Sequence, residues 1–251
     1  MEIEILKQEK DRSFFILSGI NHVIANTLRR LAINEVPTLA IERVTFKKNS
    51  SALYDEVVAN RLGLIPIKTD VKDDMPEEGK TSTEVTMSLK VEGPAIVWSS
   101  QIESSDKKLA PAIPNLHITK LLKDQELEFE AVAVMGQGKD HAKFSPGLVY
   151  YTGVPTLKVS KDSNAKAVAD MFPEVIASKG QGLEIKDLTL WNDAMEEICE
   201  TNNITIEYSM TDYMFCVESW GQLTPKEIMT KAVDMLDLKL DEFEKALKKV
   251  K

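Results

Sequence analysis

The chain has 251 residues, 43% of them hydrophobic and 28% charged, which is the composition of a globular protein and not of a disordered one. Its net charge of −9 favours protein partners over direct binding to nucleic acid, because phosphate contacts require a basic surface. No apolar run approaches the ~20 residues of a membrane span and the N-terminus has no apolar signal core, so we expect neither membrane insertion nor secretion.

The N-terminal residues predict a β-hairpin followed by a helix. Ile3 and Ile5 alternate with glutamates, and the apolar run 14–17 follows a polar turn, which is typical of a hairpin with one buried face. The helix is indicated by apolar residues at steps of three or four, namely Ile20, Ile24, Leu28 and Leu31. Ser18 or Asn21 is its expected N-cap, and Pro37 ends it.

A strand over 39–46 and a second helix over 51–62 come next. The strand segment is rich in β-branched and aromatic residues. Ser50 or Ser51 is the expected N-cap of the helix, and Gly63 is the expected C′ residue before Pro66.

The middle of the chain predicts strands over 85–91, 95–98 and 127–134, the last ended by Gly136 and Gly138. Polar segments with prolines, 68–83 and 100–115, predict exposed loops. Residues 161–203 have a different character, with short helical patterns at 165–171 and 191–200, and predict a small third subdomain.

The C-terminus predicts a second hairpin and a long helix. Residues 204–208 and 213–217 alternate around a turn at 209–212. Thr224, Pro225 and Glu227 form a capping-box signature, after which no Gly or Pro occurs. The apolar stripe of this helix consists of Ile228, Ala232, Leu236, Leu240, Phe243, Leu247 and Val250. Its distal half needs a cover, for which a partner subunit is the simplest candidate.

Several motifs together resemble the alpha-type assembly subunits of cellular RNA polymerases, and most closely the archaeal D-type subunits. They are NTLRRLAINEVPTLAIERV, LYDEVVANRLGLIPI, MGQGKDHAKFSPGLVYY and FCVESWGQLTPKEIMTKAVDML, in this order along the chain. The resemblance implies an α+β fold in which a split dimerisation domain, made of antiparallel hairpins and two helices, is interrupted by other domains. We expect the dimerisation domain at 1–46 and 204–251, a strand-rich insert domain at 47–160, and the third subdomain at 161–203.

By this resemblance the chain is a non-catalytic subunit of a DNA-directed RNA polymerase. It is expected to form a heterodimer with a small L-type subunit and to serve as the assembly platform for the large catalytic subunits. Small zinc-binding polymerase subunits are further implied partners, and the implied location is the cytoplasm. The alternative hypothesis is a protein-interaction module of another multisubunit complex.

The expected contact residues follow from the predicted helices and the resemblance. Arg29 and Arg30 lie about 100° apart on the first helix, so one is expected to face solvent or a partner. With Asn60 and Arg61 at the end of the second helix, they are the implied contacts to a large subunit. The predicted dimer interface consists of Ile24, Leu28, Leu31, Leu236, Leu240, Phe243 and Leu247.

Catalytic and cofactor sites are not indicated. His22, His117 and His141 lack metal-ligand spacing, and a glycine-rich segment, Gly136-Gln137-Gly138-Lys139, lacks the spacing of a phosphate loop. Cys199 and Cys216 are too few for a disulfide framework and fit a reducing compartment. Some D-type subunits hold an iron–sulfur cluster in a cysteine-rich third domain, but only Cys199 lies in that region here, so we predict no cluster. The acidic residues Asp73, Asp74, Glu77 and Glu78 indicate a solvated charge run.

Overall fold

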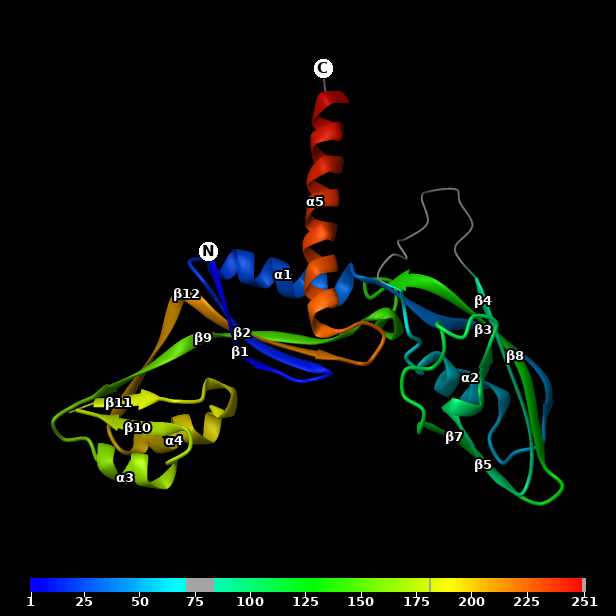
Figure 1. Cartoon of the computed structure of the whole chain (residues 1–251), viewed down its shortest axis with the longest axis horizontal. Coiled ribbons are helices and arrows are strands. Elements are labelled where there is room, and N and C mark those ends of the chain that lie inside the picture. The colour runs from blue at the N-terminus through cyan, green and yellow to red at the C-terminus, as the bar shows by residue number, and fades with distance from the viewer. Residues whose placement is uncertain (71–83, 181, 250–251) are drawn as a thin grey trace. The chain divides into compact units, whose positions relative to one another are not determined.

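The computed structural model describes residues 1–70, 84–180 and 182–249 (Figure 1). The predicted combination of α-helices with antiparallel strands is confirmed. The helices and strands in chain order are β1 (Glu2–Gln8), β2 (Arg12–Ser18), α1 (His22–Asn34), β3 (Pro37–Asn49), α2 (Asp55–Gly63), β4 (Val85–Glu92), β5 (Ala95–Trp98), β6 (Glu103–Ser104), β7 (His117–Leu121), β8 (Glu126–Gln137), β9 (Gly147–Val159), α3 (Ala165–Met171), β10 (Ile176–Lys179), β11 (Gly182–Ile185), α4 (Asp193–Thr201), β12 (Ile204–Ser219) and α5 (Pro225–Lys249).

The chain divides into two compact units, each made of two chain segments. The first unit comprises residues 1–27 and 150–216, and the second comprises 28–149 and 217–251. Each unit has a hydrophobic core of its own. The divisions fall inside α1, β9 and β12, which are continuous elements. The division into three domains with boundaries near residues 46, 160 and 203 stays a prediction.

The first unit is built on a four-stranded sheet in the order β1-β2-β12-β9. The N-terminal hairpin is confirmed, with Ile3 opposite Leu17 and Ile5 opposite Phe15. Phe15 stacks on Phe215 with ring centroids 5.3 Å apart, and Tyr151 approaches Phe215 at 5.4 Å. Aromatic packing of this kind adds stabilisation beyond the area buried, so it ties β2 to β12 and β9.

The predicted C-terminal hairpin is wrong, because residues 204–219 form the single strand β12. Two-residue hairpin turns require a residue with positive φ, and residues 209–212 contain none, because among the described non-glycine residues only Asp124 and Asn203 have one. Ser209 Oγ instead accepts a hydrogen bond from the amide of Asp212 at 3.0 Å. This local polar pair resembles a turn signal in the sequence, while the backbone stays extended.

Residues 160–204 form a small α/β cluster within the first unit. Helix α3 has the predicted bounds, and α4 begins two residues later than its predicted pattern. Between them lies the hairpin β10–β11, which the sequence did not indicate. The buried core of this cluster consists of Val168, Ala169, Val175, Ile176, Leu183, Cys199 and Ile204, together with Leu157 of β9.

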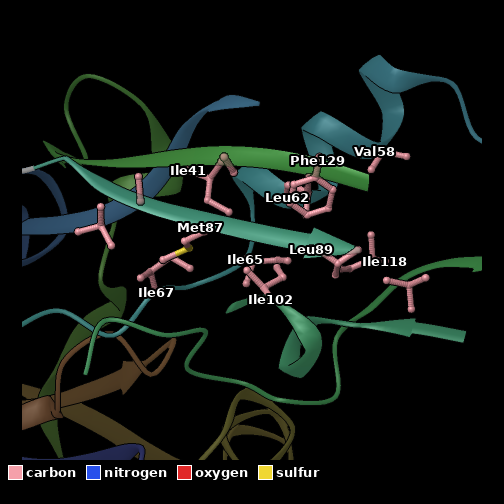
Figure 2. Packing of buried hydrophobic residues seen from close by; sticks show 14 of the residues in the cluster. Ile41, Val58, Leu62, Ile65, Ile67, Met87, Leu89, Ile102, Ile118 and Phe129 are labelled. Carbon is pink, nitrogen blue, oxygen red and sulfur yellow. The ribbon is translucent and has the colours of Figure 1, made fainter. Parts of the chain in front are cut away.

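The second unit contains a four-stranded sheet in the order β3-β8-β4-β6 and a two-stranded sheet of β5 and β7. The strands predicted at 85–91 and 95–98 are confirmed. The strand predicted at 127–134 lies within β8, but β8 continues through Gly136 to Gln137, and Gly136 pairs with Thr38 of β3. Figure 2 shows Val58 and Leu62 of α2 packed with Ile41 and Phe129 of the sheet in one apolar core.

Helix α2 differs from its prediction at both ends. It begins at Asp55 after Tyr54, which makes no side-chain capping bond. Ser51 does not cap this helix, because its hydroxyl donates to Asn49 Oδ1 at 2.7 Å in the turn that follows β3. Gly63 is the last helical residue, and the cap Leu64 has φ −91° in place of the left-handed conformation expected of a C′ glycine.

The starts of α1 and α5 are confirmed. Asn21 Oδ1 accepts a hydrogen bond from the amide of Ile24 at 3.0 Å, as an N-cap does. In α5 the amide of Glu227 donates to Thr224 Oγ1 at 3.3 Å, and Glu227 Oε2 accepts from the amide of Thr224 at 2.7 Å. Helix α5 then runs unbroken for 25 residues, roughly 38 Å (Figure 1).

The predicted loop at 68–83 lies largely outside the described residues, and Asp73, Asp74, Glu77 and Glu78 lie wholly outside them. Within the described ranges, every helix is too short or too polar to span a bilayer.

Candidate protein-interaction surfaces

Helix α5 has two apolar faces, only one of which the chain itself buries. Ile228, Ala232 and Met235 recur at steps of four and three and are buried. A second row, rotated around the helix, consists of Val233, Leu236, Leu240, Phe243 and Leu247, and is called the α5 stripe below. The sequence had merged both faces into one stripe, because apolar spacing does not reveal which face has a neighbour.

The α5 stripe is open to solvent along most of its length. Leu240 is 56% exposed, Phe243 63% and Leu247 54%, and Val233 is also exposed. Leu236 is half-buried, and every described residue after it in α5 is exposed. Val250, the last residue of the predicted stripe, lies outside the described residues. An apolar row of this length on a helix marks a surface for another protein.

The middle of α5 is fixed by an ion-pair cluster at Glu35, the residue after α1. Lys239 Nζ lies 3.0 Å and Lys139 Nζ 3.2 Å from the Glu35 carboxylate, whose side chain is 16% exposed. Burial raises the pKa of Glu35, but hydrogen bonds from Lys239 and Lys139 outweigh it, so the pKa lies below its ordinary value. Gln137 Nε2 also donates to the Glu35 carbonyl at 2.7 Å.

The glycine-rich segment at 136–139, whose first two residues end β8, packs against the end of α1. A Cβ on Gly138 would clash with the carbonyl oxygen of Ile33, and one on Gly136 would lie 2.6 Å from the Phe144 ring. The amide of Lys139 donates to the carbonyl of Asn34 at 3.0 Å, capping a free carbonyl of the helix. The glycines therefore permit close backbone packing.

His141 and His117 have structural partners. His141 Nδ1 accepts a hydrogen bond from the amide of Lys143 at 3.1 Å, at the start of a short 3₁₀ turn. The His117 ring lies edge-on to Trp98, with centroids 5.7 Å apart. His22 is exposed at the first turn of α1.

Helix α1 offers only part of its predicted contact set to a partner. Ile24 is 44% exposed, Leu28 is half-buried, and Leu31 is buried within the chain. Arg30 is exposed, whereas Arg29 is half-buried and already engaged in an interaction. Of the two arginines, Arg30 is thus the one free to approach another molecule.

Helix α2 presents a second exposed surface. Asn60 and Arg61 are exposed, but Arg61 Nη1 donates to the carbonyl of Ile118 at 2.7 Å, which fixes the end of α2 to β7. Beside Arg61, at helical steps of three or four, lie Tyr54, Val57 and Leu64, all exposed and apolar. These three residues were not among the predicted contacts, although their helical spacing in the sequence indicates a shared face.

Both cysteines are buried free thiols. Burial and then the nearby Glu196 charge raise the pKa of the Cys199 thiol, which lies in the core of the 160–204 cluster. Cys216 Sγ accepts a hydrogen bond from Arg12 Nε at 3.4 Å. Among the residues that the structure describes, no three His, Cys, Asp or Glu side chains are grouped to hold a metal ion.

Comparison with known proteins shows which family the chain resembles. Residues 40–147 match the family described as RNA polymerase Rpb3/RpoA insert domain. The chain is 36% identical to the DNA-directed RNA polymerase subunit Rpo3 of Pyrococcus furiosus, over 100% of this chain and 98% of that protein. It is 36% identical to the Rpo3 subunit of Thermococcus kodakarensis, over 100% and 99% of the two chains, and 34% identical to that of Methanosarcina acetivorans, over 97% of each.

Proposed function

The chain belongs to the Rpo3 family of archaeal DNA-directed RNA polymerase subunits, and we propose that it pairs with a small L-type subunit to form the platform for the large catalytic subunits. Its role in the polymerase is structural and non-catalytic. The observation that carries the proposal is the α5 stripe, which stays exposed in a chain aligned over its whole length with polymerase subunits. This family membership favours a polymerase over another multisubunit complex.

The α5 stripe supplies the main part of the proposed dimer interface. Leu240, Phe243 and Leu247 each keep more than half of their surface in water, so a partner helix gains free energy by covering them. Ile24 and Leu28 of α1 are proposed to contribute further apolar surface. Leu31 supports α1 from inside, since it has almost no surface left for a partner.

The proposed domain organisation follows this role. Residues 1–46 and 204–251 form the dimerisation domain, 47–160 the insert domain, and 161–203 a third subdomain. The family match over 40–147 supports an insert in the middle of the chain. The third subdomain is proposed to need no iron–sulfur cluster, because an apolar core fills it.

A second proposed surface contacts a large catalytic subunit through Arg29, Arg30, Asn60 and Arg61. The exposed apolar residues Tyr54, Val57 and Leu64 extend this surface on α2. Small zinc-binding polymerase subunits are further proposed partners, and the proposed location is the cytoplasm. The net charge of −9 supports contact with protein subunits over direct contact with nucleic acid.

Leu247→Asp tests the proposed pairing. A charge without a counter-ion in an apolar helix seam is strongly unfavourable, so we expect the variant to lose the heterodimer with the L-type subunit on a sizing column. Leu238→Asp is the matched control, because Leu238 is equally exposed but lies outside the α5 stripe. Unchanged pairing of Leu247→Asp, with both variants folded by circular dichroism, contradicts the proposal.

Arg30→Ala tests the second surface. We expect it to weaken capture of the large subunit in a pull-down while pairing with the L-type subunit is retained, since Arg30 offers an exposed guanidinium for a carboxylate. Equal loss of both partners instead indicates a role in the dimer interface or in folding.

A further inference from the structure

A row of acidic side chains follows the α5 stripe along its solvent side. Asp234, Asp237, Asp241 and Glu244 recur at steps of three, four and three, so they share one side of the helix. Each comes one residue after a member of the stripe, which rotates the row by about 100° from it. All four side chains are exposed. The row is called the acidic row below.

Most of this negative charge is not neutralised within the chain. Lys239, which lies two residues from both Asp237 and Asp241, pairs with Glu35. Glu244 pairs with Lys248 at 2.7 Å, one turn further along. In the part of the chain that the structure describes, Asp234, Asp237 and Asp241 form no ion pair.

The opposite edge of the α5 stripe has a different composition. The residues one position before each member of the stripe are Ala232, Met235, Lys239, Glu242 and Ala246. Ala232 is buried and Lys239 is held by Glu35, so this edge merges into the face that the chain buries. A partner seated on the stripe therefore meets one exposed carboxylate, Glu242, along one edge, and along the other it meets three carboxylates that form no ion pair within the described chain.

The spacing of the stripe specifies a helix as the partner element. Its members alternate steps of three and four, an average of 3.5 residues, which is the seam of a helix pair. Residues 233–247 extend over roughly 21 Å, so a partner helix of about 15 residues covers them. In such pairs the charged residues flanking the seam select the partner.

We infer that the α5 stripe receives an amphipathic helix whose outer edge carries lysine or arginine side chains at steps of three and four, opposite the acidic row. This inference rests on the proposed function and specifies the chemistry of the pairing helix of the L-type subunit. The apolar seam supplies affinity, and the acidic row selects the partner and its orientation. A second copy of this chain is the rival occupant, and in an antiparallel pair it sets acidic row against acidic row.

The test neutralises the row without changing its shape. The triple variant Asp237→Asn, Asp241→Asn, Glu244→Gln is compared with a control of equal charge change at exposed sites elsewhere, Glu92→Gln, Glu103→Gln, Glu174→Gln. The dissociation constant of the full chain with the purified L-type subunit is measured at about 50 mM and about 500 mM NaCl. We expect the row variant to bind about tenfold more weakly at low salt and to differ less than about twofold at high salt. The control is expected to match the wild type.

The outcomes separate this inference from the function on which it rests. If Leu240→Ala weakens pairing but the row variant keeps wild-type affinity and salt dependence, the basic partner edge is refuted while the proposed pairing stands. If neither variant weakens pairing, α5 is not the interface and the proposed function fails with it. Sedimentation of the chain alone addresses the rival occupant, and a micromolar homodimer indifferent to the row substitutions overturns the inference.

Discussion

Leu240→Ala should weaken pairing with the L-type subunit and leave the isolated chain as stable as before. Leu240 lies at the centre of the α5 stripe and is 56% exposed, so the chain itself uses less than half of its surface. Complete burial of a leucine side chain is worth about 1.5–3 kcal/mol. The share left for a partner is therefore about 1–1.5 kcal/mol, which corresponds to a roughly tenfold rise in the dissociation constant.

Leu238→Ala is the matched control for this measurement. Leu238 is 52% exposed, nearly the same as Leu240, but two residues along a helix place it about 160° away from Leu240. Both variants remove the same side chain from the same helix at the same exposure, so they should change helix propensity and chain stability equally. Only the contact with a partner on the stripe differs between them.

The assay is titration of the labelled L-type subunit with each variant, alongside urea unfolding of each chain alone. We expect unfolding free energies within about 0.5 kcal/mol of the wild type for both, because the substituted surface is exposed. Equal dissociation constants for Leu240→Ala and Leu238→Ala would refute the assignment of the stripe. A large loss of stability for Leu240→Ala would also refute it, by placing that residue in the chain's own core.

Two further predictions concern the supports of the α5 surface. Since the pKa of Glu35 is lowered in the folded chain, its ion pairs stabilise the fold above the ordinary carboxyl pKa and are lost as pH falls through the folded-state value. Glu35→Gln should therefore cost about 0.5–1 kcal/mol of unfolding free energy at pH 7 and almost nothing in acid below both values; a pH-independent cost contradicts this. Gly138→Ala should destabilise the chain by about 1–3 kcal/mol in urea unfolding, because its Cβ meets the Ile33 carbonyl. Gly63→Ala is the control, because Gly63 is helical and its Cβ would lie 3.6 Å from the nearest atom, the carbonyl oxygen of Ile41. We expect it to be neutral or to stabilise the chain by about 0.5–1 kcal/mol. A larger loss of stability for Gly63→Ala than for Gly138→Ala contradicts the packing argument.

Local signals predicted the starts of α1 and α5 correctly, because a cap is decided by a few neighbouring residues. Thr224 and Glu227 bond each other's amides whatever the rest of the chain does. The errors arose where a local signal had two uses. Ser51 could cap a helix or close the turn after β3, and Ser209 with Asp212 could mark a turn or lie within a single extended strand. Only strand pairing decides such cases, and pairing is not local.

The contact residues on α1 and α2 illustrate a different limit. Arginine suits an interface, but the guanidinium of Arg61 donates a hydrogen bond to the carbonyl of Ile118, 57 residues away in sequence, and so stabilises the chain's own fold. Leu31 has the spacing of its neighbours on α1 and is nevertheless buried by the chain itself. Periodicity identifies the apolar face of a helix, whereas its burial depends on elements that the sequence does not place.

In helix α5, the difference between the face that the chain buries and the face that it leaves exposed indicates the function. Its apolar residues occupy two adjacent faces, one ending in buried Met235 and the other continuing through Phe243 and Leu247 in solvent. A helix serving only its own fold needs the first face alone, and its distal turns could be polar throughout. The stripe and the acidic row beside it recur in register over about three turns, a pattern that the chain's own contacts do not require. A second helix with a basic edge accounts for both rows at once, since it covers the apolar row and attracts the carboxylates beside it.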